Sequence, residues 1–188
     1  MTNEKPKFNP WPLFIGGVGV LALVAFIALP NMLRSRGYSN ESAAIGACKT
    51  FASSEDTFKR VDYDSNGVLE YATTLKALYG DGKINLVDRA FANAEYSATA
   101  TPKAGYFFKV LNAQGSGAKG GAMSYLDEKG NMTKGYALLA IPASYDHQNN
   151  SFMISHDGTV YQKDLGMDAE KQNQSITVFD PTGWTVAE

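Results

Sequence analysis

A run of uncharged, apolar residues near the N-terminus constrains this chain more than any other feature. Seventeen consecutive residues at 13–29 are apolar or glycine, and no charged residue occurs over 8–33. A helix rises about 1.5 Å per residue, so such a run reaches roughly 26 Å, the short end of a bilayer span. The sequence therefore predicts a short tail over residues 1–10, a transmembrane helix over 11–30, and an extracytoplasmic domain over 31–188.

The residues that flank the run fit a single-pass anchor. Trp11 lies where an interfacial aromatic residue is expected. Two basic residues precede the run and two follow it, namely Lys5, Lys7, Arg34 and Arg36. The distribution of basic residues therefore gives almost no preference for either orientation of the helix in the membrane. The brevity of the N-terminal tail favours placing the larger, C-terminal part outside the cytoplasm.

A cleaved signal peptide is the alternative interpretation of the same run. Its cleavage site needs small residues at alternate positions after the apolar core. Here Phe26 and Ala28 put a bulky residue at one of those positions, and Pro30 follows almost at once. We therefore expect an uncleaved anchor, with Met1 or Thr2 retained at the N-terminus.

Composition excludes several other classes of protein. Hydrophobic residues make up 44% of the chain and charged residues 19%, which is too apolar for a disordered chain. With 17 basic and 19 acidic residues the net charge is −2, and the basic residues are scattered, so we expect no nucleic-acid partner. The single cysteine, Cys48, excludes an intrachain disulfide and a multi-cysteine metal site.

Helical periodicity dominates the chain up to about residue 95. Beyond a kink expected near Pro30 or Gly37, Ser39 or Asn40 can cap a helical stretch that runs to about residue 60. Its apolar residues recur at spacings of three and four and predict one buried face: Ala44, Ala47, Cys48, Phe51 and Phe58. Two short helices are predicted after it, over 71–79 and 86–95.

Strand patterns replace helical ones from residue 105 onward. Strands are predicted at 106–111, 135–141, 151–155, 159–163 and 176–179, with a polar helical turn over 167–174. Asp157 and Gly158 between two of these runs give a strong hairpin signal. The glycine-rich segment 115–121 is interpreted as a flexible surface loop. Helices followed by an antiparallel sheet predict an α+β fold.

Two family resemblances follow from these segments. Residues 28–36 (ALPNMLRSR) and 40–47 (NESAAIGA) resemble the N-terminal helix of type IV pilin-like proteins and secretion pseudopilins. The later strands and the hairpin follow the order of that family. The resemblance implies a membrane helix that continues into a soluble pilin-like domain with an antiparallel sheet. It also implies that the helix lies in a bacterial inner membrane and that the domain lies in the periplasm or at the cell exterior.

The second resemblance covers residue 105 to the C-terminus. This part is similar to an uncharacterised bacterial family of unknown function. The residues that carry the similarity occur in five stretches: 105–111, 120–122, 135–138, 154–166 and 179–181. That family implies no activity.

The departures from the pilin pattern bear on function. Pilin precursors are processed at a glycine followed by Phe-Thr-Leu-Ile-Glu, whereas residues 8–16 here read FNPWPLFIG. The chain has no Gly-Phe junction and no acidic residue within the apolar run. The acidic residue of pilins offsets the N-terminal amine of a neighbouring subunit, so one pairing interaction within the membrane is missing. We therefore expect an accessory subunit bound to protein partners in a membrane complex, with a filament-forming pilin or secretion pseudopilin as the alternative.

One motif predicts a cation site. Asp62, Asp64, Asn66 and Gly67 match positions 1, 3, 5 and 6 of an EF-hand loop, where oxygen ligands surround Ca²⁺. Position 12 holds Thr73 in place of a bidentate glutamate, and Glu70 could substitute for it. An Asx-rich turn without metal is the alternative, because these residues favour turns anyway. If Ca²⁺ binds, a Kd of about 10⁻⁴–10⁻³ M is expected, and the role is structural.

No residue set predicts catalysis. His147 and His156 lie in a polar loop and at the hairpin, and neither has a second histidine at metal-ligand spacing. Ser144 and His147 share one loop, which is not the arrangement of a nucleophile and its base. We therefore expect no enzyme activity and no cofactor apart from Ca²⁺; an envelope enzyme is the least favoured alternative.

Overall fold

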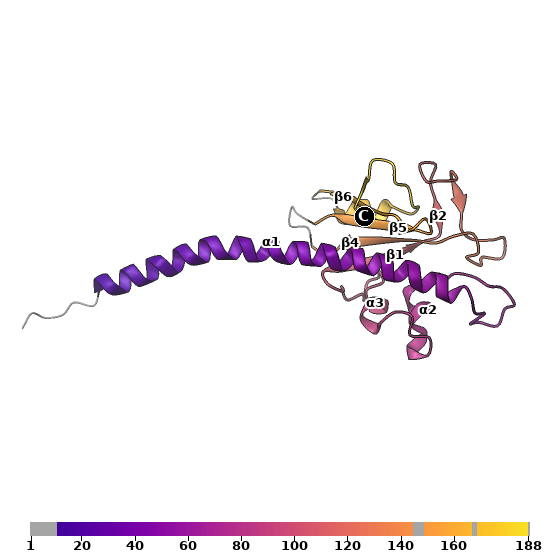
Figure 1. The fold of residues 1–188 in the computed structure, drawn as a ribbon, viewed down its shortest axis with the longest axis horizontal. Helices are drawn as coiled ribbons and strands as arrows, with labels where there is room; N and C mark the ends of the chain where they lie inside the picture. Colours follow the sequence, from indigo (N-terminus) through magenta and orange to yellow (C-terminus); the bar gives the residue numbers. More distant parts are fainter. Residues whose placement is uncertain (1–10, 145–148, 167–168, 188) are drawn as a thin grey trace, which may run out of the picture. The chain divides into compact units, whose positions relative to one another are not determined.

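The computed structural model describes residues 11–144, 149–166 and 169–187, with side chains described from residue 35 onward except at 169–170 and 173. The chain forms two compact units, Met1–Gly37 and Tyr38–Glu188. Helix α1 (Trp11–Phe58) begins in the first unit and ends in the second (Figure 1). Within the described part of the chain, no helix combines the length and the apolar character needed to cross a membrane. The side chains of the predicted transmembrane segment lie outside that part.

The long helix predicted to end near residue 60 is confirmed, the new cap predicted at Ser39 or Asn40 is wrong, and the kink expected near Pro30 or Gly37 stays a prediction. Helix α1 has no break at Pro30 or Gly37, so Ser39 and Asn40 lie inside it and do not cap a new helix. A proline removes one backbone hydrogen bond, and a glycine in a helix costs only about 1 kcal/mol. Neither is enough to end a helix whose neighbouring turns remain bonded.

The second unit is built on a five-stranded antiparallel sheet, which confirms the α+β class. The strand order is β1-β4-β5-β6-β7, and every neighbouring pair is antiparallel. The bounds are β1 (Tyr106–Leu111), β4 (Ala137–Pro142), β5 (Ser151–Ser155), β6 (Val160–Lys163) and β7 (Thr185–Val186). The predicted hairpin is confirmed, since Ile154 pairs with Val160 across it.

Two features of the strand pattern were not predicted correctly. Residues 176–179 form no strand; Phe179 makes only an isolated bridge with Gln114, and the last strand is β7. A small second sheet, β2 (Ala113–Gln114) with β3 (Met123–Ser124), encloses the glycine-rich segment. Strands of two residues are too short to show alternation, so the sequence carries no periodic signal for them.

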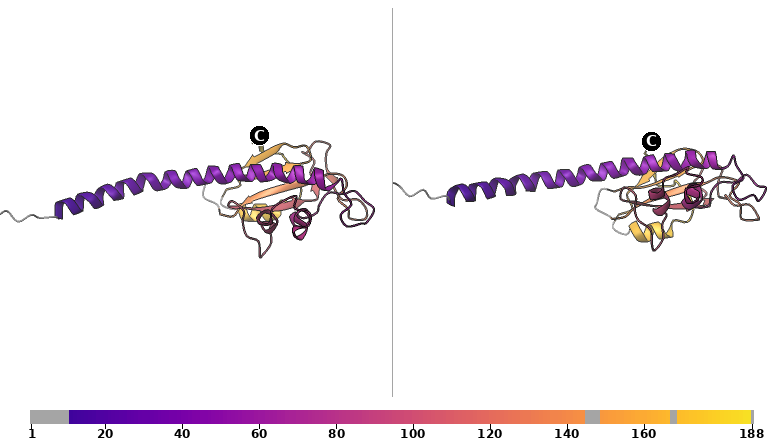
Figure 2. Two further views of the ribbon diagram at one scale, coloured as in Figure 1. Left: turned by 60° about the horizontal axis from the view of Figure 1, so that its bottom comes forward. Right: turned by 90° about the horizontal axis from the view of Figure 1, so that it is seen from below.

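The second half of α1 packs on one face of the sheet (Figure 2). The five residues predicted to form its buried face are all buried. Phe51 of this face meets Tyr136 edge to face, with ring centroids 5.6 Å apart. β4 and β5 are buried at every residue, so both faces of the sheet are covered. α4 (Ala169–Ser175) contacts β4, and Lys109 of β1 donates to the carbonyl of Ile176 after α4.

The two short helices are shorter than predicted, because side-chain caps set where they begin. α2 (Leu75–Tyr79) starts after Thr74, whose hydroxyl accepts from Ala77 N–H. It continues into a 3₁₀ turn, η1 (Gly80–Gly82). α3 (Arg89–Asn93) starts after Asp88, which caps Phe91 N–H at 2.7 Å. An N-cap residue lies outside the helix it caps, so the apolar residues before Thr74 and Asp88 are not helical.

Candidate functional site

The loop after α1 is closed by its own side chains. The two carboxylate oxygens of Asp62 accept from the backbone N–H groups of Asn66 and Gly67, at 3.1 and 2.8 Å. These bonds lower the pKa of Asp62, the Gly67 bond most of all. Ser65 and Gly67 have φ of 61° and 81°, the left-handed backbone region that a sharp turn needs. Asp62 therefore holds the loop in its bent form.

Asn66 joins the other two carboxylates of the predicted cation site. Its amide nitrogen donates to Asp64 at 2.9 Å and to Glu70 at 3.2 Å. Its amide oxygen accepts from Val68 N–H at 2.7 Å, which fixes the direction in which the NH₂ group points. Burial and the nearby charge of Asp64 raise the pKa of Glu70. The structure thus brings Asp64, Asn66 and Glu70 together through an amide donor.

These hydrogen bonds bear on the calcium prediction. Within the described part of the chain, no three acidic, histidine or cysteine residues are grouped so that they could hold a metal ion. Asn66 presents its NH₂ group to the carboxylates, whereas a Ca²⁺ ligand must present oxygen. The bonds from backbone N–H groups to Asp62, Asp64 and Asn66 fit an Asx-rich turn, and Ca²⁺ binding stays a prediction.

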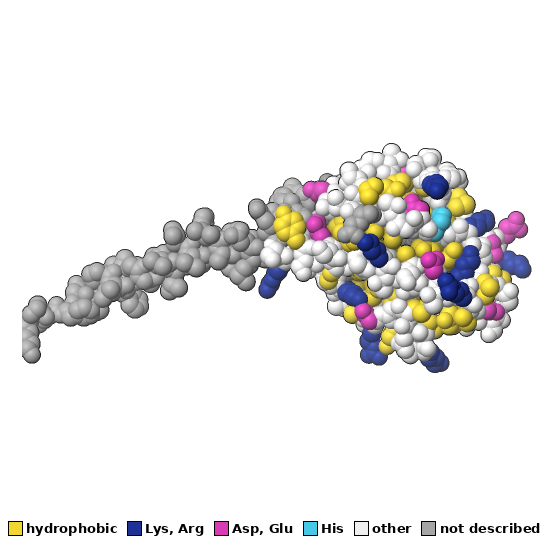
Figure 3. Space-filling view, in the orientation of Figure 1, with side chains coloured by type: hydrophobic (Ala, Val, Ile, Leu, Met, Phe, Trp, Pro, Cys, Tyr) yellow, Lys and Arg dark blue, Asp and Glu magenta, His cyan; other side chains and the backbone are white. Residues whose placement is uncertain are grey.

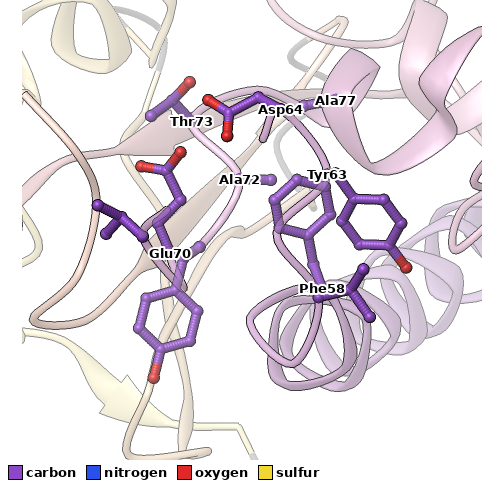
Figure 4. A pocket seen from close by; sticks show the side chains of 10 residues that line it. Phe58, Tyr63, Asp64, Glu70, Ala72, Thr73 and Ala77 are labelled. Atoms are coloured by element: carbon purple, nitrogen blue, oxygen red, sulfur yellow. The ribbon is translucent and has the colours of Figure 1, made fainter. Parts of the chain in front are cut away.

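A cavity of about 170 Å³ lies beside this loop, at the end of α1 (Figure 4). Asp64, Glu70 and Thr73 contribute oxygen atoms to its lining. Phe58 and Tyr63 form an aromatic wall, with stacked rings whose centroids are 4.7 Å apart and whose planes differ by 30°. Val61, Val68, Tyr71, Ala72 and Ala77 complete the lining. We call this cavity the loop pocket.

Exposed apolar side chains occur in the loop that borders the pocket, and two of them, Val61 and Tyr63, line it. Val61, Tyr63 and Leu69 are 47%, 40% and 54% exposed. They account for three of the six large hydrophobic residues that are exposed in the described part of the chain, and they lie within nine residues of one another. Elsewhere on the domain, Figure 3 shows basic and acidic side chains interspersed over the visible face. Exposed apolar side chains gathered in one place are typical of a binding surface.

A buried carboxyl group holds the segment that follows this loop. Glu55 of α1 is fully buried, and its Oε2 accepts from Ala72 N–H at 2.7 Å. Its Oε1 is buried and has no hydrogen-bond partner among the described residues. Burial raises the pKa of Glu55 to about 8, and the Asp56 charge adds to the effect. Glu55 thus attaches the lining residue Ala72 to the helix.

Sequence reasoning missed both Glu55 and the aromatic wall of the loop pocket. Glu55 follows Phe51 by four residues and precedes Phe58 by three, so it lies within the apolar stripe of α1. A charged residue within an otherwise apolar helix face was the sequence signal that could have identified Glu55. The stacking of Phe58 on Tyr63 depends on how the loop turns back, and no sequence signal reveals it.

The remaining candidates have structural roles or lie outside the described residues. Cys48 is fully buried, and burial raises the pKa of its thiol to about 12, as expected of a structural cysteine. His156 is exposed at the hairpin and lies beside the ring of Tyr125. The structure does not describe His147, so the pairing of Ser144 with it falls outside the described part of the chain.

The glycine-rich segment helps to line a second cavity, of about 440 Å³, which His156 also lines. One polar side chain of this cavity, that of Gln114, is fully engaged within the protein. Gln114 donates to the carbonyls of Lys119 and Gly121 and accepts from the Tyr125 hydroxyl at 3.0 Å. The segment predicted to be a flexible loop is therefore held by a buried glutamine.

Comparison with known proteins gives a family and no activity. A search of curated proteins and a search of solved structures each found no match. Residues 27–187 match a family described as "Protein of unknown function (DUF2950)". This confirms the expected relation to an uncharacterised family, and no comparison supports the pilin resemblance. The match covers most of the chain and all of the strands, so the chain belongs to the DUF2950 family.

Proposed function

We propose that this protein is a non-catalytic subunit of a bacterial envelope assembly, anchored in the inner membrane by residues 11–30 and exposing its folded unit in the periplasm or outside the cell. One observation carries the proposal: the uncharged apolar run belongs to the same helix, α1, whose later residues form part of the domain core. Residues 13–29 have the length and composition of a short span.

The surface around the loop pocket supports a role in binding other proteins. A cluster of exposed apolar residues is unfavourable in water unless a partner covers it, at least part of the time. Val61 and Tyr63 are both exposed and both line the loop pocket. A subunit that binds partners has a use for this surface, and it is the observation that favours an assembly role over an unaccompanied anchor.

Membrane extraction of the full-length chain tests the anchor. Lysine at both Val20 and Val24 places two charges one helical turn apart inside the apolar run, each opposing insertion by about 2.5–3.5 kcal/mol. We expect the wild-type chain to stay in the membrane pellet after alkaline carbonate extraction and the double variant to move to the soluble fraction. The matched control puts lysine at Ser42 and Gly46, two exposed positions one turn apart on the same helix. A double variant that stays in the pellet as the wild type does would refute the anchor.

Cross-linking at native abundance separates the accessory subunit from the filament alternative. The resemblance of residues 28–47 to pilin-like helices supports a filament, whereas the missing Gly-Phe junction and intramembrane acidic residue support a fixed complex. We expect cross-links to a constant set of other proteins. A ladder of bands at multiples of the single-chain mass would support the filament.

A further inference from the structure

We propose that the loop pocket is a docking site for one basic side chain, arginine or lysine, presented by a partner protein with an apolar residue next to it. The inference rests on the proposed role as a partner-binding subunit, but it does not depend on membrane anchoring. It follows from three properties of the pocket: two carboxylates, an aromatic wall, and an exposed apolar residue in its lining.

The pocket carboxylates of Asp64 and Glu70 form no ion pair with another described residue. Lys59, whose Nζ lies over the ring of the lining residue Tyr71, donates to the carbonyl of Thr133. Asp64 and Glu70 line the pocket, and Asp62 lies in the same loop. An ion pair joins Lys103 to Asp88, far from this loop in the sequence. Only the neutral amide of Asn66 bridges Asp64 and Glu70. A cation that displaces this NH₂ group from between them would gain two charge-assisted hydrogen bonds and relieve the repulsion between like charges.

The aromatic wall makes an organic cation a better fit than a hydrated metal ion. Phe58 and Tyr63 present stacked rings to the pocket, and Figure 4 shows the two rings together on one side, with the carboxyl groups of Asp64 and Glu70 away from them. Such rings attract ammonium and guanidinium groups and also cover the apolar stem of a long side chain. A ring beside this loop already binds a cation, because Lys59 Nζ lies 4.3 Å from the centroid of Tyr71.

The size of the pocket limits the occupant to a single group. A cavity of about 150 Å³ can hold a benzene-sized molecule, and the loop pocket has about 170 Å³. One guanidinium or ammonium group with part of its stem therefore fills it. Val61, which lines the pocket and is exposed, would contact a residue that flanks the basic one. Because this apolar contact adds area and the carboxylates add charge, the expected partner segment carries an apolar residue next to the basic one.

Two short peptides test the proposal directly. The full-length chain in detergent micelles is titrated with acetyl-Leu-Arg-Leu-amide and, as a neutral control, acetyl-Leu-Gln-Leu-amide, while NMR follows the backbone amides of Ala72, Thr73 and Ala77. We expect the arginine peptide to shift these signals with a Kd about five- to tenfold lower than that of the glutamine peptide. Repeating the titration with the lysine peptide shows which basic residue binds better.

Two variants assign the binding to the pocket. Glu70→Gln keeps the acceptor for Asn66 but removes the charge, and it should weaken arginine-peptide binding about five- to tenfold. Tyr63→Ala removes half of the aromatic wall and should also weaken binding. Glu128→Gln, an exposed change outside the pocket, is the matched control and should leave binding unchanged. A thermal melt of each variant shows whether it is folded.

Several results would overturn the proposal. Equal binding of the arginine and glutamine peptides would show that charge is not recognised, and no binding of either would show that the pocket is not a docking site. A shift of the same amides by millimolar Ca²⁺ alone, with no response to either peptide, would assign the carboxylates to a metal. None of these results depends on carbonate extraction, so failure of the docking site and failure of the anchor are distinguishable.

Discussion

Glu55 is a buried titratable group, and it makes stability depend on pH. Its folded-state pKa is about 8, against an ordinary value of 4.5, mainly because burial disfavours the charged form. Between these values the folded protein holds a proton that the unfolded chain has released. Raising the pH through this window should therefore lower the free energy of unfolding by up to about 1.4 kcal/mol per pH unit, and this contribution is fully present only below pH 4.5.

A glutamine at this position tests the prediction. Glu55→Gln keeps an acceptor for Ala72 N–H but cannot titrate. Urea unfolding of the full chain at several values between pH 5 and pH 8 should show a smaller loss of stability for the variant than for the wild type, and a more stable variant at the upper end. Glu128→Gln, at an exposed position, should keep the wild-type slope. Parallel pH profiles for wild type and Glu55→Gln would show that Glu55 does not titrate in this range.

Asn66 determines how strongly the loop can bind calcium. To become a ligand, its amide oxygen must leave Val68 N–H, and the NH₂ group must leave both carboxylates. This rearrangement and the threonine at position 12 predict weak binding, with a Kd of about 1 mM, at the upper end of the expected range. Calorimetry of the full chain with millimolar CaCl₂ should detect this binding, and Asp62→Ala should abolish it. An absence of heat in both proteins would leave the Asx-rich turn alone.

At the scale of elements, the start of β4 depends on close packing around a glycine. A Cβ atom added to Gly135 would lie 2.7 Å from His156 Nδ1 and 2.9 Å from the ring of Tyr125. The ring of Tyr125 is fully buried and cannot move freely. Gly135→Ala should therefore lower the free energy of unfolding by about 1–3 kcal/mol, as overpacking commonly does.

Gly46 provides the matched control for this change. It lies exposed on α1, and an added Cβ would meet nothing within 4 Å. Gly46→Ala should raise the free energy of unfolding by about 0.5–1 kcal/mol, because alanine loses less conformational freedom in a helix. Urea titration measures both variants. Equal effects of the two changes would mean that the contacts around Gly135 relax without cost.

At the scale of the whole molecule, the single cysteine allows the side of the membrane to be determined. Cys48 is fully buried and its thiol pKa is about 12, so the folded wild-type protein should not react with a maleimide near neutral pH. A cysteine at the exposed Lys129 position adds one reactive thiol to a protein whose own thiol is unreactive. We expect a membrane-impermeant maleimide to label Lys129→Cys in intact spheroplasts, and the wild type only after denaturation. Labelling of Lys129→Cys that requires membrane lysis would place the domain in the cytoplasm.

Residue patterns were enough to predict the elements whose signal is local. The periodic stripe from Ala44 to Phe58 predicted the buried face of α1, and Asp157-Gly158 predicted the hairpin, because each depends on residues within a few positions of one another. The order of helices before antiparallel strands was enough to predict the α+β class. The elements that sequence reasoning missed or misplaced, β2, β3 and β7, have two residues each and owe their existence to pairing with other segments.

The contacts that make up the candidate site depend on how the chain folds back on itself, so residue patterns did not reveal them. The motif at 62–67 predicted which carboxylates belong to the site. The direction of the Asn66 amide follows from the hydrogen bond that its oxygen accepts from Val68, and sequence spacing cannot show this bond. The wall of the loop pocket needs Phe58 at the end of α1 to meet Tyr63 after the turn. The burial of Glu55 depends on Ala72, 17 residues further on, which returns to the helix. These features are contacts between segments that folding brings together, and their energies depend on burial, which a local pattern does not specify.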